Sequence, residues 1–396
     1  MIAMKKIICA IILFCLLNTR EFDCKRTEYL RNILQELFET RKYDKRIRPV
    51  QDVSDSVVLE ISMTIAGINF VDEKSGVFST TGFLEVTWKD HFLSWQPEMF
   101  GNITNFTFPQ GNIWIPDLIL RNGVKEIKPM GGDFYYILMN YTGHVTWWPY
   151  QVFEARCEID VVYFPFDTQT CQMIFTVWNH DKNMVQIGNR SYLRLFDYYE
   201  NGIWKIFSNM SSLELDESEM FVKLIFSFNL RRKYVFYLWN LIIPLLFLGI
   251  MKVFAFLIPA ESGEKVSFTI TLFLAYGVFL NSVTSSLPEN SDSISLVCVY
   301  MEIELSLAVL TVLISSLQVK ICNRDRHIRL SRHDVWLIKL LKKESSQKFI
   351  EREDDCETDW TILSSAIDKL MIIFLIIQES LTFCIFSIVI YTNAYK

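Results

Sequence analysis

The sequence is poor in the side chains that usually perform catalysis or bind metal ions. Its 396 residues include only five histidines, which are scattered along the chain at His91, His144, His180, His327 and His333. No nucleophile stands beside a base and no cluster of metal ligands is visible, so we predict neither an enzyme nor a metal or cofactor site. Positive charge is not in excess either, because the formal net charge is −6. This argues against a general nucleic-acid binder.

Long apolar runs are missing from the first half of the chain, apart from one at its start. Lys5 and Lys6 precede an apolar run at 7–17, the layout of a secretory signal peptide cleaved near about residue 20. A membrane anchor is the alternative, but the run is shorter than the ~20 residues that a spanning helix needs. Four apolar segments of roughly that length follow later, at Tyr234–Leu257, Val266–Leu287, Ile294–Val319 and Leu370–Tyr391.

These features predict a multi-pass plasma-membrane protein with a large exported domain. We expect a signal peptide at 1–20, an extracellular domain at 21–233, spanning helices at 234–319, a cytoplasmic loop at 320–365, and a last helix with a short extracellular tail at 366–396. Both ends of the mature chain are then extracellular. The loop begins with basic residues, as the positive-inside rule requires. Residues 335–349 have the spacing of a short amphipathic helix. Glu302 and Glu304 fall inside the third span, and the sequence gives them no role.

Cysteines that could form disulfides are scarce. The chain has nine, but two leave with the signal peptide, two lie in membrane spans and two face the reducing cytoplasm. Only Cys24, Cys157 and Cys171 remain in an oxidising compartment, so we expect one disulfide with Cys24 as the odd residue. A Cys157–Cys171 bond would close a small loop and contribute ~3 kcal/mol in the loop-entropy model.

The segment between Cys157 and Cys171 has an aromatic apex, Phe164-Pro165-Phe166, followed by Asp167. We predict that this apex is exposed within its own domain and packs on another surface, such as that of the membrane domain. A purely structural loop is the alternative.

The exported segment has the pattern of an all-β domain. Alternating runs at Val57–Met63, Thr81–Trp88, Gly143–Trp148 and Phe221–Leu230 predict strands, after a helical apolar stripe at 26–41. Strands in series without helices favour a β-sandwich. Glycosylation sequons begin at Asn102, Asn105, Asn140, Asn189 and Asn209, all before the first span. The predicted fold is therefore an extracellular all-β sandwich with a four-helix transmembrane bundle.

The second apolar segment carries one polar stripe. Read as a helix, it places seven side chains on one face: Glu264, Ser267, Thr271, Leu274, Val278, Ser282 and Ser285. Such a face is poorly suited to lipid, because polar groups in hydrocarbon are costly. Several copies in a ring could enclose water with this stripe inward. Alternatively, the hydroxyls bond neighbouring helices or their own backbone.

At these motifs the chain resembles the Cys-loop family of pentameric ligand-gated ion channels, and within it the nicotinic acetylcholine receptor branch. The spacing from Cys157 to Cys171 fits the family signature, and the likeness extends over nearly the whole chain. It includes Arg48–Val50, Val71–Glu73, Trp88–Leu93, Trp114–Asp117, Asn201–Trp204, Asn240–Pro244 and Glu261–Lys265. The resemblance implies an extracellular β-sandwich, four helices per subunit and five subunits around a pore lined by the second helix.

The resemblance also assigns roles along that pore. Ser267, Thr271 and Ser282 would line it, while rings of Leu274 and Val278 would close it by dewetting. Glu264 would form a ring of carboxylates at the cytoplasmic mouth, with Glu261 just below. The Pro-Ala insertion of the family's anion channels is absent, so we predict cation selectivity. Ser285 stands where many nicotinic subunits have an acidic outer ring.

Gating contacts can be carried over in the same way. Glu73 and Arg232 match a family ion pair, and the Phe164–Asp167 apex, including Pro165 and Phe166, would rest against the 287–295 linker. Pro288 is present in that linker, whereas Ser295 replaces a second family proline. Without the resemblance, Glu73 and Arg232 would be two solvated charges of little energetic weight.

The ligand site matches the family less well. Trp178 corresponds to the central tryptophan of the aromatic box, although core packing is the alternative for any single tryptophan. Arg121 replaces a tyrosine of that box, Phe221 replaces another, and Phe83 replaces a tryptophan on the complementary face. The loop at 213–219 lacks the adjacent cysteine pair of alpha subunits. The resemblance is therefore to a non-alpha subunit.

Three functional hypotheses follow. In the first, the chain is a non-alpha nicotinic-type subunit of a heteropentamer. In the second, it is a self-sufficient homopentamer for a different small ligand, such as an amine or a carboxylate that pairs with Arg121. In the third, it is a non-conducting accessory or assembly subunit. The expected partners are the membrane, at a postsynaptic site, other channel subunits, a small-molecule neurotransmitter and permeating cations.

Overall fold

The computed structural model describes residues 26–126, 128–214, 222–285, 287, 294–324 and 360–394. Several sequence-based predictions lie outside these residues and are not described further. They are the signal peptide, the pairing of Cys24, the roles of Phe221 and Pro288, and the helix at 335–349. All four predicted strands and all four predicted spans fall largely within the described residues.

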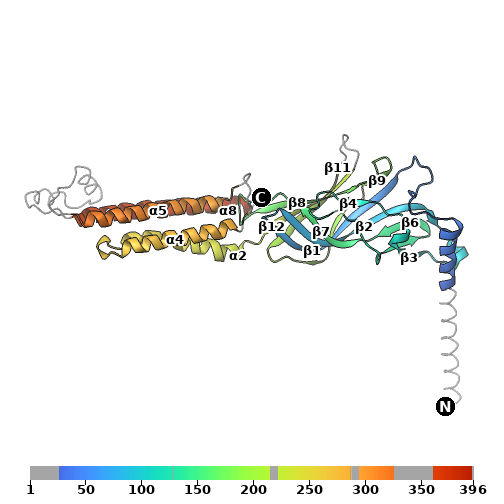
Figure 1. The fold of residues 1–396 in the computed structure, drawn as a ribbon, viewed down its shortest axis with the longest axis horizontal. Helices are drawn as coiled ribbons and strands as arrows, with labels where there is room; N and C mark the ends of the chain where they lie inside the picture. Colours follow the sequence, from blue (N-terminus) through green and yellow to red (C-terminus); the bar gives the residue numbers. More distant parts are fainter. Residues whose placement is uncertain are drawn as a thin grey trace, which may run out of the picture. The chain divides into compact units, whose positions relative to one another are not determined.

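The first of the described residues form a helix, and the chain then continues as β-strands (Figure 1). Residues 26–34 are α-helical and continue into a wider π-helical turn, η1 (Gln35–Thr40). Ile33 and Leu37 are buried on this helix. The strands are β1 (Val57–Asp72), β2 (Val77–Ser94), β3 (Asn105–Pro109), β4 (Leu118–Leu120), β5 (Tyr136–Asn140), β6 (Thr142–Trp147), β7 (Tyr150–Arg156), β8 (Thr168–Val177), β9 (Val185–Ile187), β10 (Leu193–Tyr199), β11 (Trp204–Glu214) and β12 (Lys223–Arg232).

These strands form two sheets. The larger one has eight strands in the order β10-β1-β2-β6-β5-β3, with β7 also paired to β2 and β9 to β1. The smaller one has the order β11-β12-β8-β4. Aromatic rings from both sheets meet between them: Phe78 of β2 lies 5.2 Å from Phe228 of β12, and Phe153 of β7 lies 5.6 Å from Phe175 of β8. This apolar layer confirms the predicted sandwich.

The long hairpin of β1 and β2 extends well beyond the strands that the sequence predicts. Their register shifts between Ile65 and Gly67 and again between Ile68 and Phe70. Each bulge places two successive residues against one partner and reverses which side chains face the core. The alternation that reveals a strand in a sequence is therefore interrupted within β1, although the strand itself continues.

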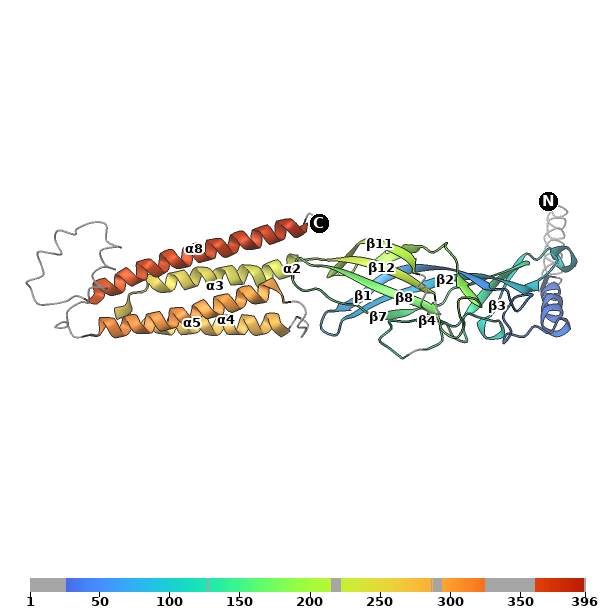
Figure 2. The ribbon, with the colours of Figure 1, turned by 90° about the horizontal axis from the view of Figure 1, so that it is seen from above.

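The helical part contains four long helices, which pack side by side (Figure 2). The first span comprises α2 (Val235–Tyr237), the π-helical η4 (Leu238–Ile242), α3 (Ile243–Phe254) and the 3-10 turn η5 (Ala255–Leu257). The wide turn precedes Pro244, which has no N–H to donate into a regular α-helical ladder. The 3-10 turn η6 (Ala260–Ser262) then leads into α4 (Glu264–Ser285), which is followed by α5 (Leu296–Cys322) and α8 (Trp360–Ala394).

All four helices are long and apolar enough to cross a membrane. Two of them extend past the apolar runs visible in the sequence: α5 continues to Cys322, and α8 begins at Trp360, ten residues before Leu370. The first turns of α8 bury Trp360, Leu363 and Ala366, with Ile321 of α5 packed against them. Hydropathy marks the part of a helix that faces lipid, whereas these turns are held by contact with protein.

The chain divides into two compact units. The β-rich unit contains residues up to 72, 76–158 and 170–230, and the helical unit contains 73–75, 159–169 and 231 onward. The segment enclosed by Cys157 and Cys171 therefore belongs almost entirely to the helical unit, together with the tip of the β1–β2 hairpin. Residues 73–75, residues 159–169 and the residues from 231 onward form the first part of the candidate site.

Candidate gating contacts and pore-facing helix

A disulfide joins Cys157, directly after β7, to Cys171 on β8. Both cysteines are buried in the β-rich unit. The bond confirms the pairing expected from the sequence. Because the two ends of the enclosed segment are tied together, residues 159–169 leave and re-enter the sandwich at one fixed place.

Arg232 is the centre of a buried charge cluster in the helical unit. Its Nε and Nη2 donate hydrogen bonds to the two carboxylate oxygens of Asp167, at 2.7 and 3.1 Å, and its Nη1 donates to Glu73 Oε1 at 2.6 Å. The side chain of Arg232 is 1% exposed, that of Asp167 is 2% exposed and that of Glu73 is 21% exposed. Arg232 and Glu73 are thus paired. Arg232 also binds Asp167 of the disulfide loop, which the sequence did not indicate as a partner.

The geometry of this cluster suits an arginine. A planar guanidinium presents two parallel N–H groups to one carboxylate and still has a third donor for a second acid. Burial alone would lower the pKa of Arg232, but the hydrogen bonds and charges of Asp167 and Glu73 raise it overall. Gln169 Nε2 also donates to Asp167 at 2.6 Å, and to the carbonyl of Asp160 at 2.7 Å. The acceptor oxygens of Asp167 are therefore fixed from two sides.

The aromatic apex of the disulfide loop does not form a free surface, because its rings pack against residues at the start of the first span. Phe164 is 4% exposed and lies 5.0 Å from the ring of Tyr237, while Phe166 lies 5.1 Å from the ring of Tyr234. The Arg232 guanidinium lies 5.0 Å from the Phe164 centroid. The apex was expected to pack on a second surface, and that surface is the start of the first span.

The same loop also reaches the start of the third span. The backbone N–H of Leu296, at the first turn of α5, donates to the carbonyl of Val162 at 3.0 Å. Ser295 precedes that helix and is 2% exposed. Pro165 follows Phe164 through a cis peptide bond and is buried. One short loop thus touches the beginning of two spans.

Helix α4 separates its residues into a buried and an exposed face. Lys265, Thr269, Leu272, Tyr276 and Val283 are buried against the rest of the chain. The seven residues of the polar stripe that the sequence marks are all exposed, and the apolar pair among them is strongly so, with Leu274 at 59% and Val278 at 70%. No helix of the described residues covers this face.

Two of the stripe's hydroxyl groups donate hydrogen bonds to the backbone of the preceding turn. Thr271 Oγ1 donates to the carbonyl of Ser267 at 2.9 Å, and Ser285 Oγ donates to that of Ser282 at 2.9 Å. This matches the alternative in which hydroxyls bond their own backbone. A hydroxyl that donates to the helix still keeps its oxygen lone pairs for water or a cation.

Two lysines inside the helix bundle pair with acids from other helices. Lys252 of α3, 1% exposed, lies 2.5 Å from Glu304 of α5 and 2.9 Å from Glu379 of α8. Gln378 Nε2 donates to the second oxygen of Glu304 at 2.7 Å. Gly249 leaves the space that the Glu379 carboxylate occupies, since a Cβ there would stand 2.7 Å from it. Glu304, which the sequence left without a role, is therefore one partner of a buried ion pair.

The predicted ligand residues lie on two different sheets. Phe83 is on β2 and stacks on Tyr150 with centroids 6.5 Å apart, whereas Trp178 directly follows β8. Trp178 is 51% exposed, so the core-packing alternative does not hold for it. The backbone N–H of Trp178 donates to the carbonyl of Asp117, and the backbone N–H of Arg121 donates to the carbonyl of Ile174. By this antiparallel register, Arg121 and Trp178 are on the same face of the smaller sheet.

The described sequons are on the surface of the β-rich unit. Asn102, Asn105 and Asn189 are exposed. Asn140 is half-buried and its Oδ1 accepts bonds from the N–H and the hydroxyl of Thr142, the third residue of its own sequon. Glycosylation at these positions and at Asn209 stays a prediction.

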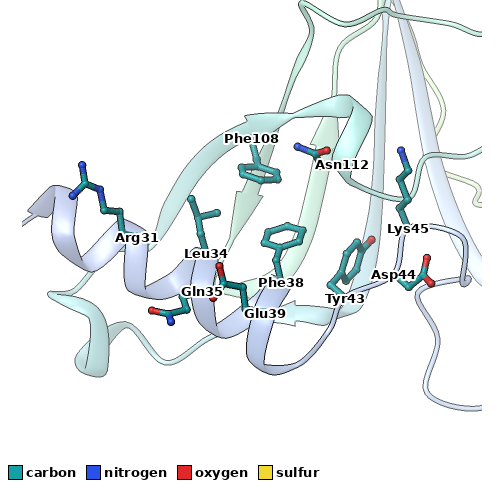
Figure 3. A pocket seen from close by; sticks show the side chains of 10 residues that line it. All are labelled: Arg31, Leu34, Gln35, Phe38, Glu39, Tyr43, Asp44, Lys45, Phe108 and Asn112. Atoms are coloured by element: carbon teal, nitrogen blue, oxygen red, sulfur yellow. The ribbon is translucent and has the colours of Figure 1, made fainter.

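A pocket of about 760 Å³ lies beside the N-terminal helix (Figure 3). Phe38 and Phe108 stack with centroids 4.8 Å apart at its wall. Arg31, Glu39 and Lys45 give it charges of both signs. It contains none of the residues that the sequence assigns to the ligand site, and we give it no part in the function.

A β-sandwich with a disulfide-tied loop, followed in the chain by four helices of spanning length, defines a multi-pass membrane protein of the receptor-channel class. Residues 30–234 match the model of the neurotransmitter-gated ion-channel ligand binding domain, and residues 241–347 match that of the neurotransmitter-gated ion-channel transmembrane region. The chain belongs to the family of neurotransmitter-gated ion channels.

The chain is similar to neuronal acetylcholine receptor subunits. It is 33% identical to the alpha-2 subunit of Gallus gallus over 293 residues, which are 72% of this chain and 54% of that subunit. It is 34% identical to the alpha-3 subunit of Homo sapiens over 304 residues, 74% of this chain and 58% of that one. The chain spans about half the length of the curated relatives it matches. These relatives are alpha subunits, and the non-alpha assignment stays a prediction.

Proposed function

We propose that this chain is a subunit of a neurotransmitter-gated, cation-selective channel whose pore is lined by α4. The observation that carries the proposal is the exposed face of that helix. Glu264, Ser267, Thr271 and Ser282 would be costly in hydrocarbon, yet the chain's own helices leave them uncovered. A ring of subunits around water satisfies them, and a face turned to lipid does not.

Cation selectivity follows from the charge at the start of α4. Glu264 is exposed in the first turn, and Glu261 is exposed in η6 just before it. In a ring of subunits these carboxylates gather around the axis, where they concentrate cations and repel anions. Leu274 and Val278 lie further along the same face, where a ring of bulky aliphatic side chains closes a pore by dewetting.

The Arg232 cluster supports gating through the disulfide loop. Asp167 and Phe164 belong to that loop, Glu73 belongs to the β1–β2 hairpin, and Arg232 lies three residues before α2. A movement of the hairpin or of the loop therefore acts on the start of the first span through a buried, multiply bonded arginine. The N–H of Leu296 gives the loop a second point of action on α5.

The agonist would bind where two subunits meet, and this chain offers Phe83 at one of its two interfaces and Trp178 at the other. A half-exposed tryptophan offers an aromatic face to a cationic group. Arg121 shares its sheet face and is unfavourable for a quaternary ammonium held by this chain alone. We infer that the chain joins alpha-type subunits in a heteropentamer and contributes the pore and a complementary face.

The test is to express the chain alone and with alpha-type partners, and to record currents under a panel of transmitters. Replacing Glu264 by Gln should shift the reversal potential in a sodium chloride gradient towards that of chloride, whereas Glu264→Asp, which keeps the charge, should not. An unchanged permeability ratio in Glu264→Gln would contradict the assigned role. Current from the chain alone would exclude an obligate partner.

A further inference from the structure

The first turn of α4 contains two neighbouring residues of opposite charge, one exposed and one buried. Glu264 is exposed on the stripe, whereas Lys265 is 0% exposed within the bundle. Lysine has a long flexible stem and normally extends its ammonium group towards water. In the proposed pore, the Glu264 carboxylates form a hydrated ring at the cytoplasmic mouth. Without other constraints, the Lys265 ammonium would extend towards that ring.

An acid on the last helix holds Lys265 in the interior. The Nζ of Lys265 forms an ion pair with Asp368 of α8, and it lies 4.9 Å from the ring centroid of Phe256. Asp368 is itself oriented by α5, because Gln318 Nε2 donates to its Oδ1 at 2.7 Å and to the carbonyl of Ser364 at 3.2 Å. The lysine of one helix is thus held by an acid of a second helix, which is oriented by an amide of a third.

We propose that Asp368 is a positioning residue for the cytoplasmic mouth of the pore: by holding the Lys265 ammonium against α8, it keeps the only basic residue of α4 away from Glu264. The inference rests on the proposed function, in which α4 lines a cation pore. Every copy of this chain in the ring brings one Glu264 and one Lys265. If the lysines turned to the axis, their charges would cancel those of the carboxylates, and cations would no longer be concentrated there.

Asp368→Asn removes the acid that holds Lys265 and keeps the size of the side chain. In single-channel recordings from the full assembly, we expect the monovalent cation conductance to fall by at least about twofold, with a smaller ratio of sodium to chloride permeability. Lys369→Met is the matched control, because it removes a charge from the exposed side of α8 at the next position. Its conductance should stay at the wild-type value.

A double variant separates this role from simple structural support. In Lys265→Met/Asp368→Asn no ammonium is left to turn towards the pore, so the conductance should return to near the wild-type value. Replacing both partners of a buried pair by neutral side chains is also better tolerated than removing one. A wild-type conductance in Asp368→Asn, or a double variant as low as that single variant, would overturn the proposal.

If Asp368→Asn does not reach the cell surface, the measurement is made on Gln318→Met. This variant keeps both charges and loses only the hydrogen bonds that orient Asp368, so conductance should fall in the same direction by less. An unchanged conductance there would also overturn the proposal. Glu264→Gln separates this inference from the proposed function: if it leaves selectivity intact, the pore assignment itself is wrong, whereas an effect of Glu264→Gln without one of Asp368→Asn rejects the positioning role alone.

Discussion

Arg232→Gln is the substitution that most directly tests the buried charge cluster. Glutamine keeps a polar side chain of moderate length but cannot give two parallel donors to Asp167 and a third to Glu73. The Asp167 carboxylate, 2% exposed, would be left with Gln169 as its remaining side-chain donor. Removing one partner of a buried pair typically costs about 3–5 kcal/mol, because the other charge stays in place without water.

The structure also orders the neighbouring variants. Asp167→Asn leaves Arg232 with Glu73 and should cost about 1.5–3 kcal/mol, the range for hydrogen bonds to charged groups. Glu73 is 21% exposed, so water screens its pairing, and Glu73→Gln should cost about 1 kcal/mol or less. The Arg232→Gln/Asp167→Asn double variant should cost at least about 2 kcal/mol less than the sum of the single variants, since the two side chains are in direct contact.

The assay is thermal unfolding of the solubilised full-length chain, followed by tyrosine and tryptophan fluorescence, with agonist-evoked current as the functional readout. For a unit of this size, about 3–5 kcal/mol corresponds to an apparent Tm lower by roughly 6–20 °C. Arg232→Lys is the control for charge alone and should recover only part of the loss. Equal costs for Glu73→Gln and Arg232→Gln would refute the reasoning, as would an Arg232→Gln protein that unfolds and conducts like the wild type.

Two further variants test other buried charges. Burial raises the pKa of Asp90 to about 6, above the ~3.9 of a solvated aspartate, so stability present below about pH 4 should fall by ~3 kcal/mol as the pH rises to 6. Asp90→Asn can still accept the 2.8 Å hydrogen bond from Tyr43 and should abolish this part of the pH dependence of Tm, whereas an unchanged slope would contradict it. Lys252→Met leaves Glu304 and Glu379 without their cation and should lower the stability of the folded chain by about 3–5 kcal/mol. We therefore expect this variant to be absent from the cell surface. Adding Glu304→Gln should restore part of the expression, and normal expression of the single variant would show that the pair is dispensable.

Periodicity in the sequence was sufficient to predict both the β-rich part and the helical part of the fold. Burial on one face leaves an apolar period of two residues in strands and 3.6 residues in helices. It underestimated β1, where two bulges interrupt the alternation, and α8, whose first turns are held by Trp360 and Leu363 rather than by lipid. Among site residues, the Cys157–Cys171 bond could be expected because few cysteines were left to pair. The exposed stripe of α4 could also be predicted, because its residues follow the same 3.6-residue period that predicts the helix.

The partners of the buried charges could not be derived from the sequence. An ionisable residue inside a span requires a partner, and two lysines and several acids were available. Which acid meets Lys252 and which meets Lys265 depends on the height of each helix and on its rotation about its axis. A rotation of 100° between successive residues is enough to separate Glu264 from Lys265, but it does not say which helix stands behind the lysine.

These ion pairs matter most for α8. Only 6% of its most apolar window is buried. Facing lipid, such a surface gives a helix little reason to dock, since lipid is as apolar as the helix itself. Its contacts include apolar side chains, with Trp360 and Leu363 at its start and Met371 and Leu375 against Phe256. They also include the acids Asp368 and Glu379, which pair with Lys265 and Lys252. An unpaired charge in hydrocarbon is costly for α8 as well as for its partners. The two ion pairs therefore act together with these apolar contacts in setting the position of α8, and the pair with Lys265 places Asp368 next to the first turn of α4.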